Sequence, residues 1–221
     1  MNRIVLIKDT AKPIVRQTAD WFVSQNDRVY LAVTRLPDHP DADVNYLVFD
    51  PFCEESLSLA AAGLKEQEGR LDILILGTSH TIHDGEIGTQ HDYDQMLDVM
   101  MENVYGNLQT VKAFEPLLKC GMKRIAGIVD IESSNNYAVQ ADDMAYHASA
   151  AAFNMMGKVL FNHLRPDGFT FRWYCEDEKQ VGICAAEYIA AALCYDEKEP
   201  YTHSDENRLV LRNALLREIP W

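Results

Sequence analysis

Short apolar runs alternate with longer segments of helical periodicity along the chain. Six runs are continuous and rich in Val, Ile, Leu or Phe, as in strands buried on both faces of a parallel sheet. These runs lie at Arg3–Ile7, Arg28–Val33, Asn45–Phe49, Leu71–Leu76, Arg124–Val129 and Phe169–Tyr174. The segments with helical spacing are Ile14–Gln25, Cys53–Glu68, Tyr93–Lys119, Met144–Leu164 and Gly182–Tyr195.

This alternation predicts an α/β fold. Right-handed βαβ crossovers would form a doubly wound parallel sheet with helices on both faces, in three αβα layers. The 221 residues contain no repeat, linker or low-complexity tract, so we expect a single domain over residues 1–221. The segment Asn207–Trp221 predicts a final strand and turn, with Trp221 packed on the body or on a partner. Ligands of such folds bind beyond the carboxyl ends of the strands, so the residues after each strand are the informative ones.

Composition and charge narrow the class of protein. Apolar residues make up 48% of the chain and the net charge is −14, which disfavours disorder and binding to nucleic acid or an anionic membrane. No apolar run approaches the roughly 20 residues that span a bilayer, and Asp9 interrupts the first run, so we expect no signal peptide. The cysteines form no metal-ligand spacing, and their odd number suggests reduced thiols, no metal site and a cytoplasmic protein. They are Cys53, Cys120, Cys175, Cys184 and Cys194.

Two stretches in the middle of the chain carry a family resemblance. Asn103 and Gly106 lie in "NVYGNLQTVKAFEPLL", and Ser133, Tyr146 and Ser149 lie in "SSNNYAVQADDMAYHASAAAFNMMGKVL". Together with "LDILILGTS" and the turn "LRPDG", these stretches resemble the N-x-x-G helix, the serine and the Y-x-x-S-K motif of the short-chain dehydrogenase/reductase family. The resemblance covers nearly the whole chain. It implies a Rossmann-like fold and NAD(P)-dependent hydride transfer on a small carbonyl or alcohol.

The resemblance assigns roles to three polar residues. Tyr146 would exchange a proton with a carbonyl or alcohol, Ser133 would hydrogen-bond the substrate oxygen, and Asn103 would hold a water in a proton relay. Asp130 or Ser134 is an alternative occupant of the serine's place. The family has a lysine at position 150 that lowers the pKa of the tyrosine and binds the nicotinamide ribose, and this chain has an alanine there. Without a nearby cation a phenol, with an ordinary pKa of ~10, is a poor base near neutral pH.

The opening turn departs furthest from the family pattern. Against T-G-x-x-x-G-x-G, the sequence "KDTAKPIV" places Asp9, Pro13 and Val15 at the three glycines. Those glycines allow the tight turn and the close approach of the backbone to a pyrophosphate. Asp9 would bring a carboxylate toward the phosphates, and Pro13 removes one N–H donor from the helix terminus. We therefore expect that no dinucleotide binds tightly.

Three further positions match cofactor contacts of the family. Asp50 follows the third strand, where an aspartate contacts the adenine. Arg35 ends the second strand and would select a 2′-phosphate, hence NADP over NAD, or is an ordinary solvated residue. Gly77, in "LGTS", retains the bend of the family's N-N-A-G. Acidic residues follow the last strand in "FRWYCEDEKQVG", so we expect the loop that covers the substrate to be very short or absent.

Three functions are consistent with this pattern. The favoured one is a divergent family member, impaired in ordinary hydride transfer, with a structural, regulatory or small-molecule-binding role. The second is a working NAD(P)H oxidoreductase with an atypical cofactor site. The third is a cofactor-independent acid/base enzyme that uses Tyr146. In each case the resemblance implies a homodimer formed through the two long helices at Tyr93–Lys119 and Met144–Leu164.

Overall fold

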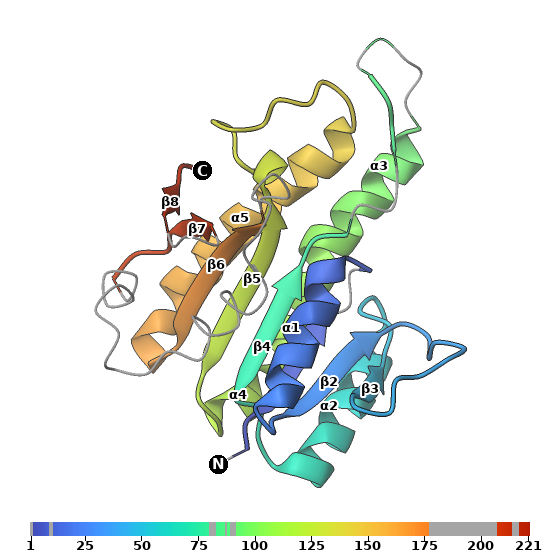
Figure 1. Ribbon diagram of the computed structural model, residues 1–221, viewed down its shortest axis with the longest axis vertical. Helices are drawn as coiled ribbons and strands as arrows, with labels where there is room; N and C mark the ends of the chain where they lie inside the picture. The colour runs from blue at the N-terminus through green and yellow to red at the C-terminus, as the bar shows by residue number, and fades with distance from the viewer. Residues whose placement is uncertain are drawn as a thin grey trace.

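One eight-stranded sheet forms the centre of the protein in a computed structural model of the chain (Figure 1). The structure describes residues 2–8, 11–79, 83–86, 88, 92–176, 207–213 and 217–221. The strand order is β3-β2-β1-β4-β5-β6-β7-β8, and every pairing is parallel except that of β7 with β8. The strands are β1 Ile4–Lys8, β2 Arg28–Val33, β3 Asn45–Val48, β4 Ile73–Gly77, β5 Arg124–Asp130, β6 Thr170–Glu176, β7 Leu211–Asn213 and β8 Glu218–Ile219. The predicted doubly wound α/β sheet is thereby confirmed.

The helices fall close to the predicted segments. They are α1 Pro13–Ser24, α2 Glu54–Glu68, α3 Tyr93–Met100, α4 Asn107–Lys119 and α5 Met144–Leu164, with short 3₁₀ turns at Ile131–Ser133 and Arg165–Asp167. A π-helical turn at Met101–Gly106 joins α3 to α4, so the predicted single helix is continuous but changes its hydrogen-bond pattern in the middle. The predicted helix at Gly182–Tyr195 lies outside the described residues. The C-terminal segment, predicted as one strand and a turn, contains two short strands, β7 and β8, and residues 214–216 between them lie outside the described residues.

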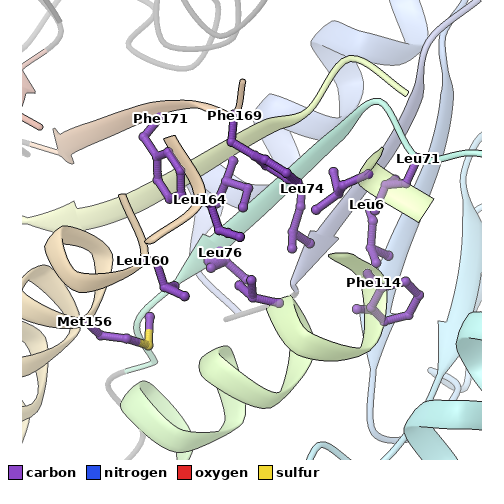
Figure 2. Close-up of a cluster of buried hydrophobic side chains, with 14 of the residues drawn as sticks. Leu6, Leu71, Leu74, Leu76, Phe114, Met156, Leu160, Leu164, Phe169 and Phe171 are labelled. Atoms are coloured by element: carbon purple, nitrogen blue, oxygen red, sulfur yellow. The ribbon is translucent and has the colours of Figure 1, made fainter. Parts of the chain in front are cut away.

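Two apolar cores lie on opposite faces of the sheet, because side chains along each strand alternate between its faces. The larger core joins strand residues such as Leu6, Leu74 and Leu76 to α2, α4 and α5 (Figure 2). The smaller core joins Val5 and Ile7 to α1. The result is the three-layer arrangement in which α1 covers one face and α2, α4 and α5 cover the other.

Trp173 fastens β5 and β6 to α5. A side chain at Gly127 would place its Cβ 2.3 Å from the indole, and one at Gly157 would place it 2.5 Å away, so only glycine fits on either side of the ring. The indole N–H donates to Asn154 Oδ1 at 3.1 Å, and Asn154 Nδ2 donates to the Ser133 carbonyl at 3.2 Å. Packing in this half of the sheet therefore also holds the loop that follows β5.

The C-terminal segment closes over the same loop. Ser134 Oγ donates to the Pro220 carbonyl at 2.5 Å, and Asn136 Nδ2 donates to the Trp221 carbonyl at 2.6 Å. Trp221 thus lies against the body of the protein through its backbone. Within the described part of the chain, no helix is long and apolar enough to cross a bilayer. In the same residues no three His, Cys, Asp or Glu side chains group as metal ligands.

Candidate functional site

Three strand ends converge on the hydroxyl of Tyr146, in the first turns of α5. The hydroxyl donates to Asp130 Oδ2, at the end of β5, in a short contact. Lys12 Nζ, just before α1, lies 2.9 Å from the same hydroxyl, and Thr78 Oγ1, just after β4, lies 3.3 Å away. Lys12 Nζ also lies 3.1 Å from Asp130 Oδ2. The edge of the sheet at β1, β4 and β5 therefore holds a cluster of Lys12, Tyr146, Asp130 and Thr78, which we call the Tyr146 cluster.

The start of α5 is fixed by the segment at residues 83–86. Asp143 precedes the helix in the left-handed region, with φ of 51°, and its N–H donates to the Gly85 carbonyl at 3.1 Å. The Asp143 carboxylate contacts His83 Nδ1 at 2.7 Å and accepts the Asp84 N–H at 3.1 Å. Asp84 Oδ2 in turn accepts the N–H of Ala145 at 3.0 Å, close to the helix terminus. These bonds orient the first turn of α5 and, with it, Tyr146.

Charge and burial set the protonation of the Tyr146 cluster. Burial raises the pKa of Tyr146 to about 12, the Asp130 carboxylate adds to the rise, and Lys12 opposes it. Burial disfavours the charge of Lys12, but Tyr146 and Asp130 outweigh it and raise the pKa of Lys12 above its usual value. At neutral pH the cluster therefore holds a phenol that keeps its proton beside an ammonium group. Such a phenol is a poor base, and its single proton is donated to Asp130, so a ligand oxygen would receive that proton only by displacing the carboxylate.

Asn103 lies in the π-helical turn and joins the end of β4 to α5. Its Oδ1 accepts the Ser79 N–H at 2.7 Å, while its Nδ2 donates to the Ser79 carbonyl at 3.0 Å and to Ser149 Oγ at 2.8 Å. Asn107 Nδ2 donates to the Gly77 carbonyl at 3.0 Å and to the Asn103 carbonyl. Asn103 and Gly77 are thus parts of a buried network that holds the end of β4, and the π-helical turn places Asn103 within it.

The three candidates for the place of the family serine have different hydrogen-bond partners in the structure. Asp130 is the one whose side chain bonds the Tyr146 hydroxyl. Ser133 is buried and its Oγ donates to the Asp130 carbonyl at 2.7 Å. Ser134 donates instead to the C-terminal segment. Asp130 therefore occupies the position beside Tyr146, and Ser133 supports the backbone that carries it.

Position 150 holds an alanine and not a cation. The Ala150 side chain is fully buried within α5. Two other basic residues of the helix contact aromatic rings: the His147 ring packs edge-on against Tyr146 with centroids 5.8 Å apart, and Lys158 lies over Phe161. The ammonium group beside Tyr146 thus comes from Lys12, in the opening turn.

The described part of the opening turn does not fit a diphosphate. Asp9 lies outside the described residues. Of the first three helix positions, Pro13 has no N–H, and the N–H of Val15 donates to the Lys12 carbonyl at 3.0 Å. Phosphates bind helix termini through free N–H groups, and two of these three positions provide none. The buried Val15 side chain also fills the place of the family's third glycine.

A pocket of about 390 Å³ opens at the carboxyl ends of β1, β2 and β3. Arg35 and Phe52 line it, together with the buried Lys8, whose Nζ donates to the Glu102 carbonyl at 3.1 Å. Burial lowers the pKa of Lys8 to about 8, an effect that the charge of Glu102 partly offsets. Asp50 is not part of the lining, and its Oδ1 accepts the Phe52 N–H at 2.8 Å in the turn before α2. The pocket thus lies where the family resemblance places the adenosine end of a cofactor, and Arg35 is part of its lining.

The sequence analysis missed Lys12, Thr78 and Lys8. Lys12 and Tyr146 are 134 positions apart, so no local motif pairs them. Two signals were nevertheless available: an alanine where the family has a lysine, and a lysine in the opening turn directly before Pro13. The parallel order of β1, β4 and β5 brings these two places to one edge of the sheet.

Comparisons with known proteins agree with this architecture. The family model described as short chain dehydrogenase matches residues 6–175. A curated relative, 1-hydroxy-2-glutathionyl-2-methyl-3-butene dehydrogenase of Rhodococcus sp. (strain AD45), is 29% identical over 148 residues, which are 64% of this chain and 58% of that protein. The chain thus matches less than two thirds of that relative's length.

Solved structures share the fold at low identity. Sniffer of Caenorhabditis elegans, a candidate carbonyl reductase, superposes with a TM-score of 0.78 at 15% identity, covering 100% of both chains. The NADPH-bound carbonyl reductase from chicken fatty liver gives a TM-score of 0.74 at 16% identity, covering 100% of this chain and 99% of that one. With the family model spanning most of its length, the chain belongs to the short-chain dehydrogenase/reductase family of oxidoreductases.

Proposed function

We propose that this chain is a divergent short-chain dehydrogenase/reductase in which ordinary NAD(P)-dependent hydride transfer is impaired and the Tyr146 cluster binds a small molecule. One observation carries the proposal: Lys12, from the turn that holds phosphate in the family, points instead to Tyr146 and Asp130, at 2.9 and 3.1 Å. The blocked helix terminus at Pro13 and Val15 supports it.

The ligand class follows from the groups that the cluster offers. A protonated phenol and an ammonium group together favour an oxygen that carries or develops negative charge. Asp130 accepts from both groups, so a bound oxygen would take the place of the Asp130 carboxylate at the phenol proton. A small molecule with a carbonyl or hydroxyl oxygen is therefore the expected ligand.

A titration with NADH and NADPH tests the proposal. The unmodified protein should show no saturable binding below about a millimolar, equivalent to roughly −4 kcal/mol of binding free energy. The matched positive control restores the family pattern by combining Asp9→Gly, Pro13→Gly, Val15→Gly and Ala150→Lys. Ala150→Lys alone should not restore binding, because the phosphate turn stays blocked. Micromolar binding of either cofactor to the unmodified protein would contradict the proposal.

A second candidate, a working NAD(P)H oxidoreductase with an atypical site, is favoured by the pocket at Arg35 and Phe52. One relative is named a dehydrogenase and one structural neighbour is NADPH-bound, which supports the same cofactor here. In this case NADPH should bind in the micromolar range, and Arg35→Ala should weaken NADPH more than NADH, because only NADPH carries the 2′-phosphate.

We also propose a homodimer through the helices α3–α4 and α5. Exposed apolar side chains on these helices include Leu97, Met155 and Val159. Apolar side chains gathered on a surface tend to mark interfaces. Light scattering at micromolar concentration should give the mass of a dimer, and Ala151→Glu, on α5, should give that of a monomer. A monomeric unmodified protein would refute this assembly.

A further inference from the structure

We propose that Lys12 replaces, from the opening turn, the cation that the family places on α5 beside the tyrosine. This inference deepens the proposed function, since it concerns the same site. It makes Lys12 a positioning residue that acts through Tyr146. The family resemblance gives no role of this kind to the turn before α1, which it assigns to phosphate.

The geometry gives one ammonium group two partners. Lys12 Nζ lies 2.9 Å from the Tyr146 hydroxyl, 3.1 Å from Asp130 Oδ2 and 5.4 Å from the centre of the Tyr146 ring. The Lys12 side chain is 16% exposed and that of Asp130 is 22% exposed, so solvent screens the group only partly. An opposite charge at such distances shifts a titration by roughly 1–3 pH units.

Local backbone chemistry directs Lys12 to this place. A residue before proline is confined to the extended region, and Lys12 has φ of −82° and ψ of 141°. Pro13 then begins α1 with its φ already suited to a helix. The proline that removes a phosphate donor thus also fixes the conformation of Lys12.

Among the described residues, the titratable groups against Tyr146 come from three elements, and the neutral Thr78 hydroxyl lies 3.3 Å from the Tyr146 hydroxyl. Asp130 belongs to β5, Lys12 to the opening turn and His147 to α5, and among them Lys12 and Asp130 bond the hydroxyl directly. Lys8, a buried lysine near this edge, donates to the Glu102 carbonyl in the β1–β3 pocket. Lys8 is therefore the matched control for Lys12.

Tyrosine titration by NMR with ¹³C-labelled tyrosine tests the inference, with Tyr146→Phe assigning the resonance. Asp130→Asn serves as the background, because removing the carboxylate lowers the pKa of Tyr146 into a measurable range. In that background Lys12→Met should raise the pKa of Tyr146 by about one unit or more. Lys12→Arg should restore the lower value, and Lys8→Met should leave it unchanged. An unmoved Tyr146 titration in the Lys12→Met variant would overturn the inference.

A second measurement needs a single substitution. In ¹³C-labelled lysine spectra of the unmodified protein, Lys12 should titrate above its ordinary range, and Asp130→Asn should bring its pKa back toward that range. A Lys12 resonance indifferent to Asp130→Asn would also refute the inference. Neither result depends on a cofactor. Tight NADPH binding would contradict the proposed function and leave this test of Lys12 intact.

Discussion

Lys8 and Lys12 stand four residues apart, in two parts of the same sheet edge, and their environments differ. Lys8 ends β1, faces the open pocket at β1–β3 and contacts a neutral backbone carbonyl, and burial lowers its pKa to about 8. Lys12 faces the β4–β5 side and meets a phenol and a carboxylate, which raise its pKa despite its burial. The partner therefore decides the direction in which the pKa of a lysine at this edge is shifted. The edge is thus divided into an open pocket and a closed, paired cluster.

The largest expected effect on stability comes from a substitution in the apolar core beneath the Tyr146 cluster. Trp173→Ala should lower the free energy of unfolding by about 3–5 kcal/mol, because the indole fills the space between Gly127 and Gly157. Urea unfolding measures it. On the pocket side, Phe52→Ala removes a half-exposed ring and should cost less than about 1 kcal/mol. Equal losses for the two variants would show that the closed part is no more tightly built than the open one.

Lys8→Met should stabilise the protein at neutral pH. The lowered pKa of Lys8 corresponds to about 3 kcal/mol of unfavourable burial, and the lost hydrogen bond to Glu102 subtracts ~1, for a gain of about 2 kcal/mol. Below pH 8 the unmodified protein bears this cost in full. Between pH 8 and 10.5 the unfolded state of the unmodified protein binds more protons at Lys8 than the folded state does. The stability of the unmodified protein therefore rises with pH, and the stability advantage of Lys8→Met decreases. Urea unfolding at pH 7 and pH 10 measures the sign of the stability difference and its change with pH. If Lys8→Met were less stable than the unmodified protein at pH 7, the proposed difference between Lys8 and Lys12 would be wrong.

Lys12→Met should destabilise the protein at neutral pH, whereas Lys8→Met should stabilise it. Removing the ammonium group leaves Asp130 and Tyr146 without a shared donor and should cost about 1–2 kcal/mol at pH 7. Because the pKa of Lys12 is raised in the folded state, its contribution is present at neutral pH and is lost as pH rises through that raised value. The same pair of unfolding measurements applies. A gain in stability at pH 7 would mean that the Lys12 ion pair does not repay its burial.

Arg35→Ala should have the smallest effect on stability. Arg35 is exposed, and it makes no hydrogen bond or ion pair with any residue in the described ranges. Its loss should change the free energy of unfolding by less than about 0.5 kcal/mol, as judged by urea unfolding. A larger loss of unfolding free energy would show that Arg35 stabilises the fold. We expect instead that its side chain is available to a ligand in the open pocket.

The sequence could predict the sheet because its strands are buried on both faces and read as continuous apolar runs. Runs such as Arg28–Val33 match β2 residue for residue, and Met144–Leu164 matches α5. It could not predict the π-helical turn at Met101–Gly106, because residues there keep ordinary helical periodicity and the change lies in backbone hydrogen bonds.

The candidate site was predictable where a motif is local. Tyr146 and Asn103 emerge from short patterns, whereas the contact of Lys12 with Tyr146 depends on strand order and on the rotamer of a long side chain. The choice of Asp130 over Ser133 also depends on the 3₁₀ turn after β5, which turns the Ser133 hydroxyl back to the Asp130 carbonyl. The roles of Asp9 and of residues 177–206 stay predictions, since they lie outside the described part of the chain.

A crystal structure of the unmodified protein grown with millimolar NADPH tests the central claim most directly. The account predicts that Lys12 Nζ stays beside Tyr146 and Asp130 and that no dinucleotide is ordered along the start of α1. A dinucleotide with its diphosphate at Pro13 and with Lys12 displaced from Tyr146 would contradict the account.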